Sequence, residues 1–296
     1  PEGARTVTVV APGLFTSVQT LGRWGRQHEG VPVGGAMDTL SHRAANRCLG
    51  NPDSAATLEV TILGPELRME CPVTVAVAGA DLDAAVDGSS VNLQTPTPIK
   101  AGATLRFRGR RSGARAYVAF DGGIDMPVRD GHRVRAGDLL LLGRAGESAP
   151  AGTVPQAPAF ARVPRLRVIA GPQRGFFDDR SLETLTRTTF TVSPKSNRMA
   201  YRLEAMQPVA RVSAGEMVSD AAFHGGVQIT PAGDAILLMA DRQTTGGYPQ
   251  IATVITADLP AAGQLAPGDA FTFELCTLRE ARAALEAQEG LLRVHS

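Results

Sequence analysis

The sequence has 296 residues and a formal net charge of +1, from 30 basic and 29 acidic side chains. A chain of this length can bury a substantial core in one large domain or two ordinary ones, and its balanced charge argues against general electrostatic attraction to nucleic acid or membranes. Aromatic residues make up only 5% of the chain, which also argues against a stacking platform for single-stranded nucleic acid.

Cysteine usage and hydropathy bear on the cellular setting. Cys48, Cys71 and Cys276 are far apart and form neither a CxxC pair nor a Cys/His metal pattern, so we expect no metal site. So few cysteines indicate a reducing, cytoplasmic setting, although one disulfide stays open as an alternative. We expect no signal peptide, and no apolar run reaches the ~20 residues that a transmembrane helix needs.

In chain order, short runs rich in Val, Leu and Ile alternate with Gly and Pro and predict many short strands. Examples are residues 73–77, 104–107, 116–120, 139–142 and 166–169. Helical patterns are few: residues 39–49 with Gly50 as C-cap, residues 178–186 with Ser181 as a candidate N-cap, and residues 278–292. The sequence therefore predicts a mainly β fold, a sandwich or barrel with a few short helices.

One element occurs three times, as a turn with Gly before a strand, at residues 99–105, 134–140 and 265–271. The repetition favours two related β-rich halves, with coincidence as the alternative because Gly-Asp turns are common. Gly and Pro break the pattern in residues 145–163, as in a linker. We therefore expect an N-terminal β-barrel domain at 1–150 and a C-terminal β-barrel domain with a terminal helix at 151–296.

The most polar connection in the chain is residues 241–249, Asp-Arg-Gln-Thr-Thr-Gly-Gly-Tyr-Pro. The apolar runs 235–240 and 251–255 flank it and predict two buried strands. A plain hairpin needs only one or two turn residues. The surplus of charged, amide and hydroxyl groups predicts a binding loop on a rigid scaffold.

Two further stretches could bind an anion. Residues 19–23 and 33–38 combine Arg23 with several glycine amides, but a structured loop in which Arg23 pairs locally is the slightly favoured alternative. Residues 193–203 contain the basic cluster Lys195, Arg198 and Arg202. This cluster could hold a phosphate or carboxylate, although a solvated basic face is the commoner outcome.

Catalytic motifs of well-known types are not found. His224, beside Gly225 and Gly226, could be a general acid or base, but a lone loop histidine is more often structural. The nucleophile elbow GxSxG is absent, which argues against a hydrolase of that type. The phosphate loop GxxxxGKS/T is absent too, so a nucleotide would not bind in a P-loop.

Taken together, ordered motifs along nearly the whole chain resemble one family. They are residues 13–19, 21–23, 30–32, 35–38, 45–46, 49–51, 58–61, 122–125, 196–199 and 241–249. They resemble the allophanate hydrolase subunit 2 family, also described as the KipA-like or biotin-dependent carboxyltransferase family. This family includes the C subunit of the bacterial ATP-dependent 5-oxoprolinase.

The resemblance implies two cyclophilin-like β-barrel domains and work in a hetero-oligomer with a KipI-like subunit 1. The leading reading is a subunit of an ATP-dependent amide or lactam hydrolase of the 5-oxoprolinase type, acting on a small amide substrate, with a LamB/YcsF-like subunit as a further candidate partner. Whether ATP binds this chain or another part of the complex stays open. The alternatives are a carboxyltransferase of the urea carboxylase type, which would use biotin on a partner, and a non-enzymatic regulatory KipA-like protein.

Under the leading reading, the loop at 241–249 contributes most of the site. Asp241 would orient or deprotonate a substrate N–H or water, and Arg242 would bind a carboxylate or a developing oxyanion. Gln243, Thr244 and Thr245 would hold the amide edge, while Tyr248 would close the pocket. This loop is expected to face Gln19, Arg23, Met37 and Asp38 of the first half, in a pocket between the domains.

One departure from the family concerns the stretch after residues 123–127. Relatives usually carry a longer segment there with Ser, Arg and glycine-rich features, whereas residues 128–134 lead almost directly to the next turn. Either this chain has a shorter segment here, or a disordered loop is absent from the sequence. No biotin-acceptor or biotin-carboxylase segment is recognisable, so carboxyl transfer would need other polypeptides.

Overall fold

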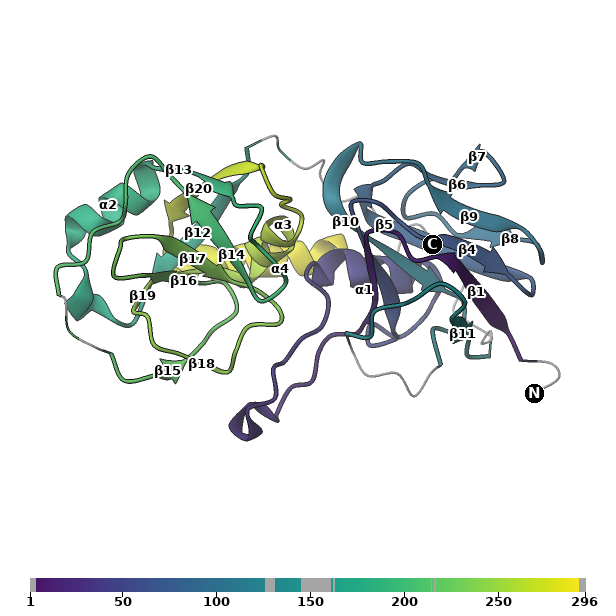
Figure 1. Ribbon diagram of the computed structural model, residues 1–296, viewed down its shortest axis with the longest axis horizontal. Helices are drawn as coiled ribbons and strands as arrows, with labels where there is room; N and C mark the ends of the chain where they lie inside the picture. The colour runs from purple at the N-terminus through teal and green to yellow at the C-terminus, as the bar shows by residue number, and fades with distance from the viewer. Residues whose placement is uncertain are drawn as a thin grey trace. The chain divides into compact units, whose positions relative to one another are not determined.

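The computed structural model describes residues 4–125, 131–144, 161, 163–213, 215 and 217–292. The chain divides into two compact units (Figure 1). Unit 1 comprises the described parts of Pro1–Gly22, Asp38–Ala159 and Glu289–Ser296, and unit 2 those of Arg23–Met37 and Phe160–Gln288. Residues 23–37 thus group with the second half of the chain. The expected linker at 145–163 lies almost wholly outside the described residues, so a boundary at 150 stays a prediction.

Two sheets form unit 1. The six-stranded sheet has the order β11 (Leu139–Leu141), β1 (Thr6–Ala11), β4 (Glu66–Met69), β9 (Thr104–Phe107), β6 (Ala84–Val86), β7 (Ser89–Ser90). The five-stranded sheet has the order β2 (Phe15–Gln19), β3 (Thr57–Thr61), β10 (Ser112–Phe120), β5 (Val73–Asp81), β8 (Thr97–Ile99). Val7 and Val9 of the first sheet and Val60 and Val118 of the second are fully buried in one core. Burying this apolar area is the main force that holds the sheets together.

The helix α1 (Thr39–Cys48) packs against the five-stranded sheet through β10 and β5. Asp38 caps it, because its side chain accepts the N–H of Ser41 at 2.9 Å. The hydroxyl of Tyr117 on β10 accepts the Asp38 N–H at 2.8 Å and donates to Glu59 at 2.7 Å. Burial raises the pKa of Tyr117 well above its usual value, so the phenol stays neutral. These bonds join the start of α1 to the middle of the sheet.

Unit 2 is a closed barrel of seven strands (Figure 1). The order is β12 (Arg165–Ala170), β19 (Gln250–Val254), β16 (Gly226–Ile229), β17 (Ala235–Leu238), β14 (Ala200–Glu204), β13 (Thr189–Val192), β20 (Ala270–Leu275). Phe190, Phe271 and Phe273 pack inside, with ring centroids 5.1–6.1 Å apart. A two-stranded ladder, β15 (Asp220–Ala221) with β18 (Thr245–Gly246), lies outside the barrel sheet.

The remaining helices are short apart from the last. They are η1 (Gln27–Glu29), η2 (Arg174–Phe176), α2 (Asp179–Arg187), η3 (Thr256–Asp258), α3 (Leu259–Gly263) and α4 (Leu278–Leu291). The expected helices at 39–49 and 278–292 are found within one residue, as α1 and α4. Ser181 is not the N-cap of α2. Asp178 is, because its backbone is extended and its carboxylate accepts the Ser181 N–H at 2.8 Å, which places Ser181 at the third helical position of a capping box.

The repeated glycine turn has one geometry in both units. Gly102, Gly137 and Gly268 have φ values of 82°, 90° and 88°, in the left-handed region that glycine reaches most easily. Each glycine N–H donates to the carbonyl of one residue on or beside a neighbouring strand, and the N–H of that same residue donates to the carbonyl of the residue after the glycine. The partner residues are Met69, Val9 and Val192, in that order. The turn thus positions the entry of β9, β11 and β20.

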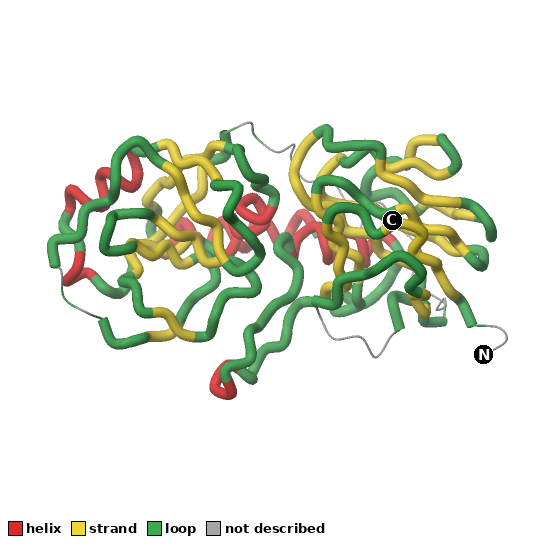
Figure 2. The backbone as a smooth tube through the Cα atoms, in the orientation of Figure 1, coloured by secondary structure: helices red, strands yellow, loops and turns green. Residues whose placement is uncertain are grey.

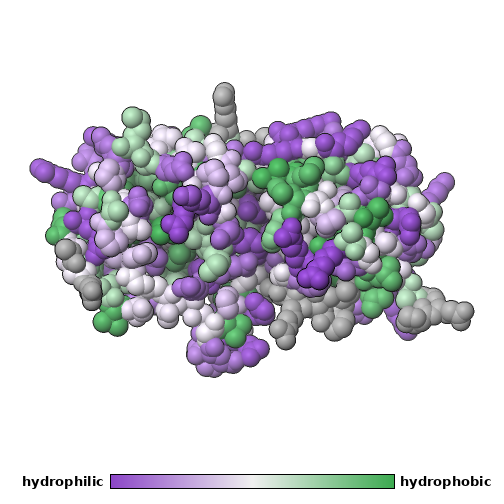
Figure 3. Space-filling view, viewed as in Figure 1, coloured by the Kyte–Doolittle hydropathy of each residue, from purple (hydrophilic) through white to green (hydrophobic). Residues whose placement is uncertain are grey.

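The mainly β prediction is confirmed, as Figure 2 shows, with the barrel formed by unit 2. Polar and apolar side chains are interspersed over the face in Figure 3. Such scattered apolar residues are ordinary on protein surfaces. Among the described residues, no helix is both long enough and apolar enough to span a membrane.

Candidate functional site

A pocket of about 270 Å³ lies in unit 2, where the polar loop at 241–249 meets three barrel strands. Its lining comes from β14, β16, β17, the ladder strand β18, and the connections beside them. The lining residues are Lys195, Asn197, Met199, Ala200, Arg202, Ala222, Gln228, Ile236, Leu238, Arg242, Gln243, Thr245, Gly246 and Tyr248. We call this the Arg242 pocket.

Local hydrogen bonds fix the loop beside the barrel. β17 ends at Leu238, and the N–H of Arg242 donates to the Met239 carbonyl at 3.2 Å, which turns the chain. Thr245 and Gly246 then pair with Ala221 and Asp220 of β15, and the N–H of Ala222 donates to the carbonyl of Thr244 at 3.0 Å. The part of the loop around Thr244 to Gly246 therefore has a paired backbone.

Arg242 brings a buried positive charge to the pocket. The residue is 9% exposed, and its Nε donates to the Ala222 carbonyl at 3.1 Å. Within the described part of the chain, no carboxylate pairs with it. Burial lowers the pKa of Arg242 from its usual value, yet a guanidinium stays protonated at neutral pH. A buried charge without a protein counter-ion is costly, so an anionic ligand would stabilise this arrangement.

Asp241, the neighbour of Arg242, is paired elsewhere. Its carboxylate accepts from Nε and Nη2 of Arg198 at 2.8 and 3.0 Å, a bidentate pair. Nη2 of Arg198 also donates to the Gly35 carbonyl at 2.6 Å. Arg198 thus ties the start of the loop to the segment 23–37. Asp241 cannot neutralise Arg242 as well without giving up this pairing.

His224 lies near both guanidiniums as a neutral side chain. Its Nε2 is buried and makes no hydrogen bond within the described residues. Burial, reinforced by the positive charges of Arg242 and Arg198, lowers the pKa of His224 to about 3. The imidazole therefore adds no charge to the pocket at neutral pH, and it is not among the residues that line it.

The side chains that line the pocket favour a small anionic ligand that also carries an amide group. Among the residues that the structure describes, three cationic ones, Lys195, Arg202 and Arg242, line the pocket, and no acidic one does. Lys195 and Arg202 are exposed, whereas Arg242 is buried. Gln228, Gln243, Asn197 and Thr245 add amide and hydroxyl groups, while Ile236 and Leu238 contribute apolar surface.

Four of the sequence-predicted residues meet here, namely Arg242, Gln243, Thr245 and Tyr248. Thr244 contributes its carbonyl to the ladder and does not line the pocket. Sequence reasoning missed Gln228 and Asn197, and it favoured a solvated role for Lys195 and Arg202. Lys195 and Arg202 line the pocket because the barrel pairs β14 with β17, and anion binding by this cluster stays a prediction.

The predicted residues of the first half have other surroundings. Met37 is 1% exposed in the core of unit 2, and Arg23 donates through Nη2 to the Pro32 carbonyl at 3.4 Å. In unit 1, Asp38 caps α1, and Gln19 donates to the Ser17 hydroxyl at 2.9 Å. None of the four lines the Arg242 pocket. A shared pocket between the domains stays a prediction.

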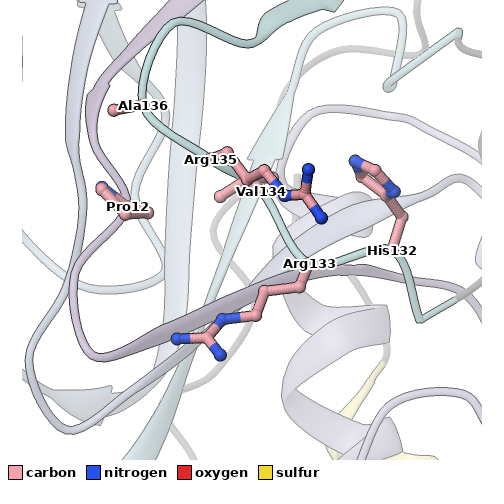
Figure 4. Close-up of a pocket in the computed structure, with 6 residues that line it drawn as sticks. All are labelled: Pro12, His132, Arg133, Val134, Arg135 and Ala136. Atoms are coloured by element: carbon pink, nitrogen blue, oxygen red, sulfur yellow. The ribbon is translucent and has the colours of Figure 1, made fainter.

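A second pocket, of about 390 Å³, lies in unit 1 and is lined by Pro12 and residues 132–136 (Figure 4). Figure 4 shows Arg133 directed away from His132 and Arg135. Arg133 donates to the Leu14 carbonyl at 3.0 Å, and all three basic residues are exposed. Solvated cations of this kind hold a ligand weakly, so this pocket is the weaker candidate. The family pattern is interrupted at residues 128–134, of which 128–130 lie outside the described residues.

Comparison with known proteins identifies the class. The family described as carboxyltransferase domain, subdomain A and B, matches residues 29–275. The chain therefore belongs to this family, and the resemblance found in its motifs is confirmed. The fold agrees, because the crystal structure of the Kluyveromyces lactis urea carboxylase superposes with a TM-score of 0.91 at 26% identity, over 98% of this chain and 29% of that one.

Within the family, the chain is similar to two kinds of protein, 5-oxoprolinase C subunits and urea amidolyases. The C subunit of the Escherichia coli K12 5-oxoprolinase is 33% identical over 297 residues, which cover 95% of this chain and 94% of that protein. The urea amidolyase of Saccharomyces cerevisiae is 29% identical over 320 residues, 97% of this chain but 17% of that protein. The chain thus spans the first relative almost completely and the second only in part.

Proposed function

We propose that this chain is the subunit of a 5-oxoprolinase-type enzyme that binds the small cyclic amide substrate in the Arg242 pocket. The observation that carries the proposal is Arg242, a buried residue that lines the pocket and pairs with no carboxylate among the described residues. The likeness to the C subunit of a 5-oxoprolinase over 95% of this chain and 94% of that protein supports a subunit of this kind.

The lining is complementary to a carboxylated lactam such as 5-oxoproline. Arg242 would take the carboxylate through its planar fork, in an environment that strengthens charge-assisted hydrogen bonds. Lys195 and Arg202, which are exposed, would attract the anion from solvent. Gln243 and Thr245 would contact the ring, and Tyr248, which is 42% exposed, would cover it.

ATP and the partner subunits enter as further parts of the proposal. A lactam is a poor electrophile, so ring opening needs activation, which we assign to ATP bound by the complex. The partners would be a KipI-like subunit 1 and a LamB/YcsF-like subunit. We assign Asp241 a positioning role, since its carboxylate holds Arg198. To act as a base, as the sequence predicted, Asp241 would have to leave its ion pair with Arg198.

A second candidate function is carboxyl transfer with a biotinylated partner. The family description and the likeness to a urea carboxylase favour it. In that reaction the same cationic pocket would stabilise a carboxylated, anionic intermediate. Biotin would have to come from another polypeptide.

The two functions are separable by reconstitution. The chain is purified together with its partner subunits, and two activities are measured: ATP-dependent release of glutamate from 5-oxoproline, and bicarbonate- and ATP-dependent carboxylation of urea with a biotinylated partner. We expect the first activity and not the second. Carboxylation of urea without cleavage of 5-oxoproline would replace the proposed function by the second candidate.

A further inference from the structure

We propose that Gln228 selects an amide-bearing ligand in the Arg242 pocket, by pairing its carboxamide with the N–H and C=O of a single cis amide. This inference rests on the proposed function and deepens it, because it names the residue that forms hydrogen bonds with the N–H and C=O of the lactam. Gln228 lies in β16, outside the loop that carries the other polar groups of the pocket.

The first observation is that Gln228 is buried without a partner. The residue is 7% exposed and lines the pocket. Its backbone pairs with Ile236 of β17 and Gln250 of β19, so the strand position is fixed. Within the described residues, no hydrogen bond is formed by its carboxamide. Neither its nitrogen nor its oxygen is among the fully enclosed atoms without a partner, so both are accessible from the pocket, and we infer that they bind a ligand there.

The second observation is that the Gln228 carboxamide lies close to Gly246 of β18. A Cβ atom at Gly246 would lie 2.6 Å from Nε2 of Gln228, a separation that real Cβ atoms do not show. Gly246 is paired with Asp220 in the ladder, so its backbone cannot easily withdraw. The absence of a side chain at Gly246 therefore leaves room for the Gln228 carboxamide beside the backbone of β18.

The chemistry of a carboxamide matches that of a lactam. A carboxamide presents a donor and an acceptor side by side, and a five-membered lactam presents its N–H and C=O on one edge because the ring enforces the cis form. Two antiparallel hydrogen bonds can then form in one plane. Arg242 would hold the carboxylate and Gln228 the amide edge. A site with buried polar groups rejects analogues that leave those groups unpaired.

The test uses three probes and the full chain in complex with its partner subunits. 5-Oxo-L-proline has both the carboxylate and the amide, cyclopentanecarboxylate has only the carboxylate, and 2-pyrrolidinone has only the amide. Dissociation constants are measured by calorimetry for wild type, Gln228→Met and Arg242→Met. Gln207→Met, at an exposed glutamine of the same unit outside the pocket, is the matched control.

We expect wild type and the control to bind 5-oxoproline more tightly than cyclopentanecarboxylate. Gln228→Met should weaken 5-oxoproline about 10- to 100-fold, the range for leaving buried polar groups unpaired, and leave cyclopentanecarboxylate unchanged. Arg242→Met should weaken both carboxylates and spare 2-pyrrolidinone.

The outcomes separate the two proposals. If Gln228→Met keeps the preference for 5-oxoproline while Arg242→Met loses binding, the inference about Gln228 is overturned and the proposed function stands. If wild type binds no 5-oxoproline, the proposed function itself is overturned. Should Gln228→Met fail to fold, Gln228→Asn, which keeps the amide but withdraws it by one methylene, must show the same selective loss.

Discussion

At the scale of single residues, we propose that Arg242 serves binding rather than stability. Its charge is buried, and no carboxylate pairs with it among the described residues. Replacing it with Met removes a buried charge at the expense of one hydrogen bond to Ala222. We therefore expect Arg242→Met to leave the free energy of unfolding of the ligand-free chain unchanged or to raise it by up to about 1 kcal/mol. A clear loss of stability in chemical denaturation would show that Arg242 is structural.

Asp241 should behave in the opposite way. Its carboxylate forms the bidentate pair with Arg198, which is 8% exposed. We expect Asp241→Asn to lower the free energy of unfolding by about 1–3 kcal/mol, since a largely buried guanidinium loses the charge of this carboxylate partner. A double-mutant cycle with Arg198→Met should give a coupling energy of similar size. Unchanged stability with abolished turnover would instead support Asp241 as the base.

His224 predicts a pH dependence of stability. Its pKa in the folded chain is lowered from 6.5 to about 3, so the unfolded chain takes up a proton at a higher pH than the folded chain. The stabilisation from neutral His224 is complete above pH 6.5 and is lost as the pH falls from 6.5 toward 3.

The maximum slope for one such proton is about 1.4 kcal/mol per pH unit. Denaturation should be followed from pH 7 to pH 5, above the range in which most carboxylates titrate, for wild type and His224→Gln. We expect a smaller loss of stability in the variant. Equal slopes for the two proteins would refute the account of His224.

At the scale of elements, the sequence pattern predicted the polar loop at 241–249 and its flanking strands. It did not predict which other strands lie beside that loop. The apolar runs 235–240 and 251–255 correspond to β17 and β19, and four of the predicted loop residues line the pocket. Local pattern is sufficient for such predictions. Gln228 was not predictable in this way, because its position beside the loop depends on pairing of β16 with β17 and β19. Nothing in the residues around Gln228 signals this pairing.

The attachment of α1 to the sheet gives a prediction for unit 1. Tyr117 bridges the Asp38 N–H and the Glu59 carboxylate from a fully buried position. Tyr117→Phe would leave these buried groups short of one partner each, so we expect a loss of about 1–3 kcal/mol in the free energy of unfolding. Tyr248→Phe, at a residue 42% exposed, is the control and should change stability little. Equal effects of the two substitutions would contradict the bridging role of Tyr117.

At the scale of the whole molecule, composition and strand patterns predicted the mainly β fold, and the repeated glycine turn recurs in both units. The grouping of residues 23–37 with the second unit was not predictable. It depends on the packing of Met37 in the core of unit 2 and on the hydrogen bond from Arg198 to the Gly35 carbonyl. The two residues of that hydrogen bond are more than 150 positions apart in the sequence. Family motifs follow the order of the chain and do not report such contacts.

The central claim is that the Arg242 pocket binds a small carboxylated amide. The most direct measurement is the calorimetric titration of 5-oxo-L-proline into the complex, with wild type, Arg242→Met and Arg165→Met, the last at an exposed surface arginine. The account predicts binding by wild type and Arg165→Met and a loss of about 10- to 100-fold in Arg242→Met. Undiminished binding by a folded Arg242→Met variant would contradict it.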